Sequence, residues 1–473
     1  MSADRRPRGL AIAFLASLVA CTPAGAPGAA FTVSPATVTM TPGSTQAFQA
    51  TTQGVADASV TWAPSCGTVG DGNPVEYTAP DIEGTCELTA TSTAHPGRSA
   101  TAVATVRANA TVTPIGGTVA TTLGASFAIR ADGTLWAWGT NRFGQLGDDA
   151  IMGRTTLDQV RDLDDVVAVA AGGAHALAVR TDGTLMAWGF NSRGQLGDGS
   201  TTNRYAPQSV PGLTDVIAVA AGDTHSLALR ADGTVWAWGR NQSGHLGDGT
   251  TTDRHVPQQV AGLSNVIAIA AGESHSLALR TAGTVWAWGW NGHGQVGHPD
   301  RFVDQLLPWH VDGLTDVTAI AAGKLHTLAL RADRTVWAWG SNLAGQLGND
   351  VPQSQPTPQQ VPGLTGVVAI AGGASHSLAV RDDGTLWAWG SNDHGQLGDG
   401  TTASRYAAAP AMHLTDVVAV ATLQHHALAV RGNGTLWAWG HNADGQLGDG
   451  STEDRREPQP VSGLTSVPAS GSP

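Results

Sequence analysis

A tryptophan–glycine dipeptide that returns about every 50 residues constrains the fold of this chain more than any other feature. The spacings between successive copies are 50, 50, 50, 51, 50 and 50 residues. A period of this size is typical of solenoids and propellers, in which each repeat is one small supersecondary unit. The tryptophans of these dipeptides are Trp138, Trp188, Trp238, Trp288, Trp339, Trp389 and Trp439.

Each repeat contains four segments with the pattern of β-strands. In the unit that begins at Val166 they are a Val/Ala run, HALAVR, LMAWG and PQSV. Asp-Gly pairs such as Asp182-Gly183 join the second and third segments and predict two-residue hairpin turns, whereas Asp333-Arg334 predicts a different turn type. No helical period is present, and four-stranded units that repeat radially favour an all-β fold of the β-propeller type.

The two ends of the repeat array complement each other. The last unit stops at residues 463–467, where a new unit would begin, and residues 118–121 can supply the missing first strand. We expect these ends to meet and close a ring, because closure removes unpaired strand edges.

The repeated sequences WAWGxNxxGQLGDG and GxxHSLALRxDGT resemble the regulator of chromosome condensation repeat family. The resemblance covers residues 118–467, about three quarters of the chain. It implies a seven-bladed β-propeller over these residues, preceded by a linker at 108–117 and followed by a tail at 468–473.

Residues 31–107 form a separate region of short alternating segments divided by turn residues. Their sequence resembles bacterial Ig-like domains, which implies a small β-sandwich that acts as a spacer, with Trp62 as a core residue on a central strand. Cys66 and Cys86 are the cysteines left after Cys21, so we expect a disulfide between them, with two free buried thiols as the alternative.

The first 30 residues have the pattern of an export signal. Arginines precede an apolar run that is too short for a permanent membrane span, and the run ends in Leu-Val-Ala-Cys at Cys21. This resembles a bacterial lipobox and implies a signal peptide at 1–20, lipidation of Cys21 and a Pro/Gly/Ala tether at 21–30. We expect a lipid anchor in the cell envelope, at the outer membrane; the alternative is an ordinary cleaved signal peptide and secretion.

Most of the repeated residues are interpreted as structural. Two tryptophans lie two apart on one strand, with Met186 in place of the first in one unit, and 13 of the 16 tryptophans belong to these pairs. A histidine also recurs, but equivalent positions on different blades cannot converge within about 2 Å of one metal ion. We expect each to be satisfied by backbone groups, and we predict no metal, no cofactor and no catalytic residue. The histidines are His175, His225, His275, His326, His376 and His426.

The turns of the predicted blades divide into two sets. In an antiparallel meander, turns 1–2 and 3–4 share one face of the propeller and turns 2–3 and 4–1 the other. The second set has nearly the same sequence in every unit, whereas the first carries aromatic and charged residues of the kind that anchor protein partners. The alternative is that these turns vary in sequence by neutral drift, because exposed loops tolerate substitution. We expect a binding patch centred on the fourth unit, where Trp290 and Trp309 lie outside the tryptophan pairs. The candidate partner-binding residues are Phe190, Arg193, Asp223, Arg240, Glu273, Trp290, His293, Phe302, Trp309 and Lys324.

Charge excludes one class of partner. The formal net charge is −13 and Lys324 is the only lysine, so a nucleic acid is not expected to bind. We expect a monomeric, non-enzymatic scaffold that binds an unidentified protein and meets the membrane through its lipid anchor alone. The alternatives are an inhibitor of an extracytoplasmic enzyme, an enzyme that uses the central channel and, by family resemblance, guanine-nucleotide exchange on a small GTPase. Exchange is disfavoured because no unit carries an inserted wedge.

Overall fold

The computed structural model describes residues 31–40, 45–52, 59–80, 84–106, 118–300, 303–464 and 466–468. These residues form 36 strands and no helix, which confirms the all-β class. The predicted signal peptide, Cys21, the tether, the linker and Phe302 lie outside the described residues. The chain divides into two compact units, Met1–Thr111 and Val112–Pro473. Within the described part, no helix has the length and apolar character needed to cross a membrane.

The first unit consists of two four-stranded sheets that share one core. The strand orders are β1-β3-β6-β5 and β2-β8-β7-β4, and β2 pairs with β8 in parallel. Phe48 and Tyr77 from the first sheet pack with Leu88 from the second. The strands are β1 (Phe31–Ser34), β2 (Thr37–Met40), β3 (Thr45–Thr52), β4 (Val60–Pro64), β5 (Thr68–Val69), β6 (Val75–Thr78), β7 (Gly84–Ser92) and β8 (Ser99–Val106).

A disulfide joins Cys66, just after β4, to Cys86 on β7, with 5.4 Å between the Cα atoms. The disulfide expected from the sequence is therefore present. Trp62 packs half-buried against this core, but the expectation of a central strand was wrong, because β4 lies at the edge of its sheet. Its Nε1 donates to the carbonyl of Gly72 at 3.1 Å. The large core side chains instead come from β3, β6 and β7.

The second unit contains seven four-stranded antiparallel sheets, each built from four consecutive strands. We call the sheets blades one to seven in chain order. Blades one to four are β9 (Val119–Thr121), β10 (Ala125–Ile129), β11 (Leu135–Gly139) and β12 (Arg154–Gln159); β13 (Val166–Ala171), β14 (His175–Arg180), β15 (Leu185–Gly189) and β16 (Arg204–Ser209); β17 (Val216–Ala221), β18 (His225–Arg230), β19 (Val235–Gly239) and β20 (Arg254–Gln259); and β21 (Val266–Ala271), β22 (His275–Arg280), β23 (Val285–Gly289) and β24 (Gln305–His310). Blades five to seven are β25 (Val317–Ala322), β26 (His326–Arg331), β27 (Val336–Gly340) and β28 (Gln355–Gln360); β29 (Val367–Gly372), β30 (His376–Arg381), β31 (Leu386–Gly390) and β32 (Arg405–Pro410); and β33 (Val417–Thr422), β34 (His426–Arg431), β35 (Leu436–Gly440) and β36 (Arg455–Pro460).

Burial explains why the middle strands of each blade are apolar. In β18 every residue except the final arginine is buried, because this strand has neighbouring blades on both faces. Leu227 and Leu229 of blade three pack against Ile269 and Trp288 of blade four in one cluster. The fourth strand is the most exposed of the blade, and it carries the polar residues.

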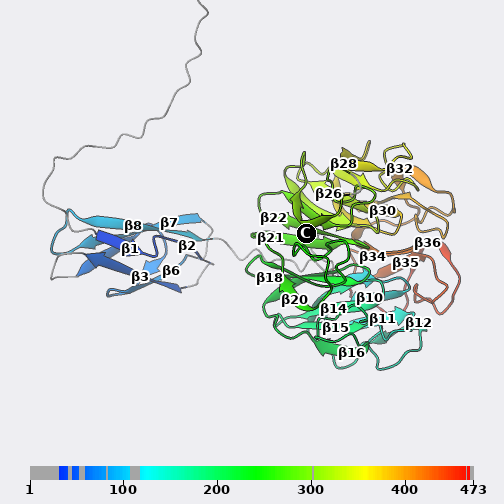
Figure 1. The fold of residues 1–473 in the computed structure, drawn as a ribbon, viewed down its shortest axis with the longest axis horizontal. Coiled ribbons are helices and arrows are strands. Elements are labelled where there is room, and N and C mark those ends of the chain that lie inside the picture. Colours follow the sequence, from blue (N-terminus) through cyan, green and yellow to red (C-terminus); the bar gives the residue numbers. More distant parts are fainter. Residues whose placement is uncertain are drawn as a thin grey trace, which may run out of the picture. The chain divides into compact units, whose positions relative to one another are not determined.

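The blades close into a ring, as the sequence predicts. The first strands of neighbouring blades contact one another, and β9 contacts both β13 and β33. The backbone N–H of Ala131 donates to the carbonyl of Ser466 at 2.8 Å, and the Thr118 hydroxyl donates to the carbonyl of Pro468 at 2.9 Å. Figure 1 shows the cyan strands of blade one beside the red strands of blade seven.

The turns between second and third strands differ from the expectation. Arg180 N–H donates to the carbonyl of Thr184 at 3.0 Å, so three residues rather than two lie in the turn, and only Gly183 has a positive φ, of 76°. This is the three-residue hairpin whose last position requires the left-handed region. The turn at Arg334 does not change type, because this arginine adopts the same conformation with a φ of 63°.

Candidate functional site

The hydrogen bonds of the ring assign its turns to two faces. Phe190 N–H donates to the carbonyl of Ala174 at 2.9 Å, which joins turn 3–4 to turn 1–2 of the same blade. Val216 N–H donates to the carbonyl of Gly183 at 3.1 Å, which joins turn 4–1 to turn 2–3. We call the first set the variable face and the second the uniform face. The variable face consists of residues 122–124, 172–174, 222–224, 272–274, 323–325, 373–375 and 423–425 with residues 140–153, 190–203, 240–253, 290–300, 303–304, 341–354, 391–404 and 441–454.

The inner strands enclose a central cavity of about 210 Å³. Its wall is mainly apolar, with residues such as Val169, Val219, Ile269 and Ile320 facing it. The residues that line it include alanines, threonines and a glycine but no carboxylate, histidine or cysteine. The polar side chains among these lining residues are the hydroxyls of Thr121 and Thr422.

The mouth of this cavity at the variable face brings together three of the predicted residues. Asp223, Glu273 and Lys324 line one small pocket with Gln424. Lys324 Nζ lies 3.4 Å from a carboxylate oxygen of Glu273. Burial raises the pKa of Asp223, while Lys324 and Arg240 act in the opposite direction. A half-buried charged cluster at the centre of a face is suited to a polar contact with a partner.

The predicted aromatic and arginine residues form separate contacts around this mouth. The rings of Phe190 and Phe143 lie 4.7 Å apart between blades one and two. Arg193 pairs with Asp253 at 3.5 Å between blades two and three. Arg240 donates to the side-chain oxygen of Gln242 at 2.7 Å.

Trp290 and Trp309 lie in different parts of blade four. Trp290 lies in turn 3–4 of blade four, with its ring 5.5 Å from that of His293. Trp309 lies within strand β24, half-buried, 4.3 Å from the ring of His298 and opposite Ala287. Trp309 therefore packs on the side of its blade, because the divergent segment of the fourth unit re-enters the sheet before this residue. Phe302, another residue expected in the binding patch, lies outside the described residues.

The recurring histidines bond to side chains rather than to the backbone groups we expected. His225 is fully buried, and its Nε2 lies 3.0 Å from the hydroxyl of Ser276 in the next blade. The Ser276 hydroxyl donates to the carbonyl of His245 at 2.8 Å, so the imidazole N–H must be the donor to Ser276. Serine or threonine plays this part at the other histidines too, in the pairs His175–Ser226, His275–Thr327, His326–Ser377, His376–Thr422 and His426–Ser126.

Burial keeps these imidazoles neutral. It lowers the pKa to about 3 for His175, His275, His326, His376 and His426. For His225 burial lowers the pKa well below the ordinary value, and the nearby His245 and His175 add to the effect. Their Nδ1 atoms have no hydrogen-bond partner in the structure. Each histidine thus joins two blades, and its ring is enclosed between them.

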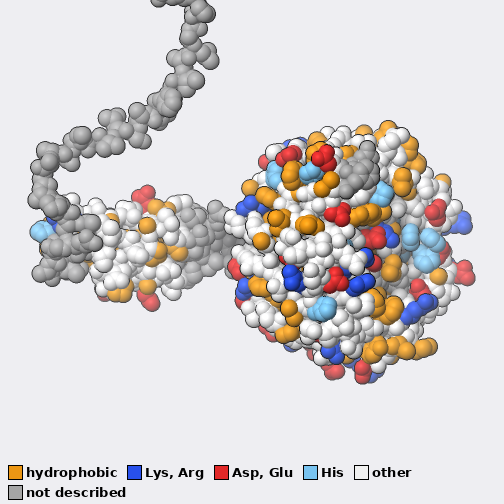
Figure 2. Space-filling view, viewed as in Figure 1, with side chains coloured by type: hydrophobic (Ala, Val, Ile, Leu, Met, Phe, Trp, Pro, Cys, Tyr) orange, Lys and Arg blue, Asp and Glu red, His pale blue; other side chains and the backbone are white. Residues whose placement is uncertain are grey.

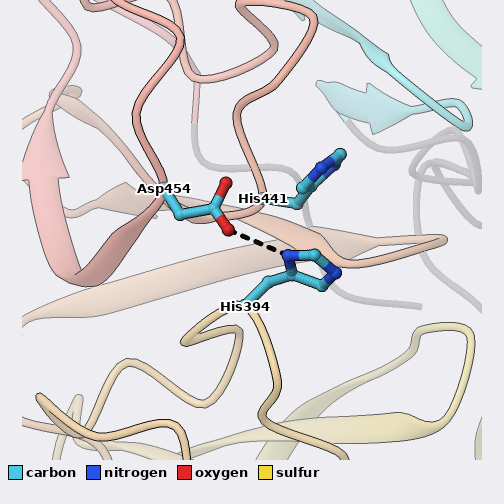
Figure 3. A group of neighbouring side chains, drawn as sticks. All are labelled: His394, His441 and Asp454. Carbon is cyan, nitrogen blue, oxygen red and sulfur yellow. Dashed lines mark hydrogen bonds and ion pairs between the residues drawn. The ribbon is translucent and has the colours of Figure 1, made fainter.

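One group of potential metal ligands escaped the sequence interpretation. His394, His441 and Asp454 offer ligand atoms that all lie within 4.8 Å of one another. Figure 3 shows both rings and the carboxylate gathered at one place, and Figure 2 shows histidine side chains over the strands of blade seven. Burial lowers the pKa of His441, and His394 adds to this. Burial followed by the neighbouring His394 and His441 likewise lowers the pKa of His425.

Comparisons with known proteins agree with this architecture. The RCC1-like domain model matches residues 153–472. A structure of yeast RCC1 (Prp20) bound to Kap60 is 26% identical with a TM-score of 0.63, covering 72% of this chain and 84% of that one. A structure of Prp20p from Saccharomyces cerevisiae is 27% identical with a TM-score of 0.62, covering 72% of this chain and 86% of that one. Human WBSCR16 shares the fold at 23% identity and a TM-score of 0.63, covering 70% and 94%.

A search of curated protein sequences finds no match. The matched family region spans six of the seven blades and extends to the end of the ring. The six buried histidines and six of the seven Trp-Gly strands lie in the matched region, whereas β9, β10 and β11 of blade one precede it. The chain therefore belongs to the RCC1-like domain family.

Proposed function

We propose that this protein is a non-enzymatic scaffold whose seven-bladed propeller binds another protein through the variable face. The observation that carries the proposal is the contrast between the two faces. The turns of the uniform face are variants of Asp-Gly-Thr and Gly-Leu-Thr-Asp, whereas the variable face carries a phenylalanine pair at one blade junction and an ion pair at the next. Aromatic and arginine residues on one face, around a charged centre, are the usual anchors of a protein interface.

The relatives of known structure support a binding role for the fold. The yeast protein was crystallised with Kap60, and its second structure is described together with its binding to Gsp1p and histones. An inhibitor of an extracytoplasmic enzyme is one form that such binding could take in this chain. Nucleotide exchange is a weaker alternative, because the repeats differ by a single residue in spacing and carry no inserted wedge.

The test is capture of partners after chemical cross-linking in intact cells, with two matched triple variants. Phe190→Ala, Arg193→Ala and Trp290→Ala alter the variable face. Thr214→Ala, Ser264→Ala and Thr315→Ala alter exposed residues of the uniform face. We expect the first variant to lose the proteins that the wild type captures and the second to keep them. Retention of the same proteins by the first variant, at unchanged melting temperature, contradicts the proposal.

We also propose that a signal peptide at 1–20 exports the chain, that lipid on Cys21 holds it in the cell envelope, and that an Ig-like domain at 31–107 acts as a spacer. The support is the order of arginines, apolar run, small residues and cysteine. Two or three acyl chains are sufficient for firm anchoring, at about 0.8 kcal/mol per buried methylene. Radiolabelled palmitate should enter the wild type but not Cys21→Ala, and equal labelling of both would contradict lipidation at this residue.

A further inference from the structure

The junction between blades six and seven carries three potential metal-binding side chains on the variable face. His394 comes from turn 3–4 of blade six, and His441 and Asp454 come from the two ends of turn 3–4 of blade seven. The Nδ1 of His394 lies 2.8 Å from a carboxylate oxygen of Asp454, and the two rings have centroids 4.4 Å apart. Figure 3 shows His394 and Asp454 pointing toward each other from loops of two different blades, with the side chain of His441 beside them.

The same positions are in contact at other junctions, but with other side chains. Arg193 and Asp253 form their ion pair at the positions of His394 and Asp454, and both pairs are 60 residues apart. Phe143 and Phe190 are in contact, with their rings tilted by 52°, at the positions of His394 and His441. The proximity of the three ligands is therefore set by the blade geometry. Of the described residues, this group alone offers three histidine or acidic ligand atoms that close together.

The backbone of both turns holds these side chains in place. One oxygen of Asp454 accepts the N–H of Asn442 at 2.8 Å, which leaves the other oxygen for the junction. His394 N–H donates to the side-chain oxygen of Gln396 at 2.9 Å, and His441 N–H donates to the carbonyl of His425 at 2.9 Å. Ligands on braced turns lose little conformational entropy on binding a metal ion.

We propose that His394, His441 and Asp454 bind one divalent first-row transition metal ion that ties blade six to blade seven. Two imidazoles and one carboxylate are a set that Zn²⁺ and its neighbours prefer, with positions left for water. Ligands about 2.1 Å from a tetrahedral ion lie about 3.4 Å apart, so the side chains must draw together slightly. The ring of His425 lies 5.3 Å from that of His394, and its Nδ1 is 3.5 Å from Nε2 of Gln396.

The ion must replace hydrogen bonds that already exist. The bond between His394 and Asp454 is lost, and Gln446 Nε2 already donates to Nδ1 of His441 at 2.9 Å. We therefore expect moderate rather than extreme affinity. The inference does not depend on the proposed function, because the ion contacts only this chain.

Zn²⁺ is the probe for the test. The whole chain, purified without a polyhistidine tag and treated with a chelator, is titrated with ZnCl₂ in a calorimeter. We expect one equivalent to bind, and we expect His394→Ala and His441→Ala each to weaken binding by about 100-fold or more, since even loss of an outer partner costs 10–100-fold. The matched control is His293→Ala, which removes a histidine from the same turn position of blade four and should leave binding unchanged.

Two further measurements separate ligation from misfolding. Co²⁺ bound to the wild type should give visible absorption bands that disappear in His394→Ala, and Zn²⁺ should raise the melting temperature of the wild type but not of that variant. Both metal-free proteins should melt at nearly the same temperature. The proposal is overturned if the wild type binds no equivalent of Zn²⁺, or if the double variant His394→Ala with His441→Ala binds as tightly as the wild type.

Discussion

The junctions between blades are built in two layers that follow different rules. In the buried layer the same bonds return at most junctions: a histidine donates to a hydroxyl of the next blade, and a fully buried tryptophan such as Trp238 donates its Nε1 to the carbonyl of Gln195 at 2.8 Å. The equivalent Nε1 of Trp339 has no acceptor. In the exposed layer, on the variable face, the contact is a phenylalanine pair at one junction, an ion pair at another and two histidines with an aspartate at a third. Repetition in one layer maintains the ring, which leaves the other layer free to vary.

Two junctions lack the usual histidine–hydroxyl pair, and both show that a buried histidine requires a hydrogen-bond acceptor. At the junction of blades one and two, Ala125 replaces the histidine and Ala176 replaces the hydroxyl, so both partners are absent together. At the junction of blades six and seven, Ala427 replaces the hydroxyl, and Thr422 from the neighbouring strand bonds to His376 at 3.0 Å instead. A buried donor without an acceptor costs about 1–3 kcal/mol, which explains why one partner does not occur alone.

Lowering the pH should destabilise the buried layer more strongly than any other change considered below, because this layer contains the neutral histidines. The pKa of the buried histidines is lowered to about 3, as in His275, from 6.5. The unfolded chain therefore takes up protons first, and the stability present above pH 6.5 is lost as the pH falls toward 3. Each buried histidine contributes a slope of about 1.4 kcal/mol per pH unit in this window. Calorimetry from pH 7.5 to 4.5 should show the ring's melting temperature falling steeply.

The control for acid is the ring variant His175→Ala with Ser226→Ala, which copies the natural alanine pair. Its stability should fall less steeply with pH than that of the wild type. An identical slope in the two proteins would mean that His175 is not the neutral, buried group described above.

Truncation to alanine should lower the free energy of unfolding by different amounts at the two tryptophans of each pair. Trp238→Ala removes a fully buried ring and its bond to Gln195, so we expect a loss of about 3–5 kcal/mol in the free energy of unfolding. Trp236→Ala removes a half-buried ring whose Nε1 bonds within its own blade to Thr234, so the loss should be clearly smaller. Urea unfolding measures both, and equal losses would contradict the assignment of Trp238 to the buried layer.

A double-mutant cycle tests the histidine–hydroxyl bond. Ser276→Ala leaves the imidazole N–H of His225 buried without its acceptor, and we expect a cost of about 1–3 kcal/mol. His225→Ala with Ser276→Ala should cost less than the sum of the single changes. Additive costs in urea unfolding would show that the two side chains do not act as a pair.

Substitutions in the exposed layer should change the free energy of unfolding least. Arg193 and Asp253 are joined at 3.5 Å with side chains that remain partly in water, so Arg193→Ala should change the free energy of unfolding by less than about 1 kcal/mol. The same denaturation series provides the measurement. A loss as large as that of Trp238→Ala would remove the distinction between the layers.

The parts that the sequence could predict are those set by the pattern of one repeat, by the two ends of the repeat array and by the pair of cysteines. The strand order, the closure by residues 118–121 and the disulfide follow from patterns within the chain. Contacts between blades depend on how adjacent sheets are placed relative to each other, and this placement cannot be predicted from the sequence of one repeat. For this reason we expected backbone partners for the histidines and did not single out Asp454. Aligning the repeats on the contact of Arg193 with Asp253 would have pointed to it.

The most direct test of the central claim places a photo-reactive amino acid on each face in turn. One variant carries it at Phe190 on the variable face, and the other at Thr214 on the uniform face, with irradiation of intact cells and detection of adducts by mass. We predict a discrete protein adduct from position 190 and none from position 214. A discrete adduct from position 214 with none from position 190 would contradict the assignment of function to the variable face.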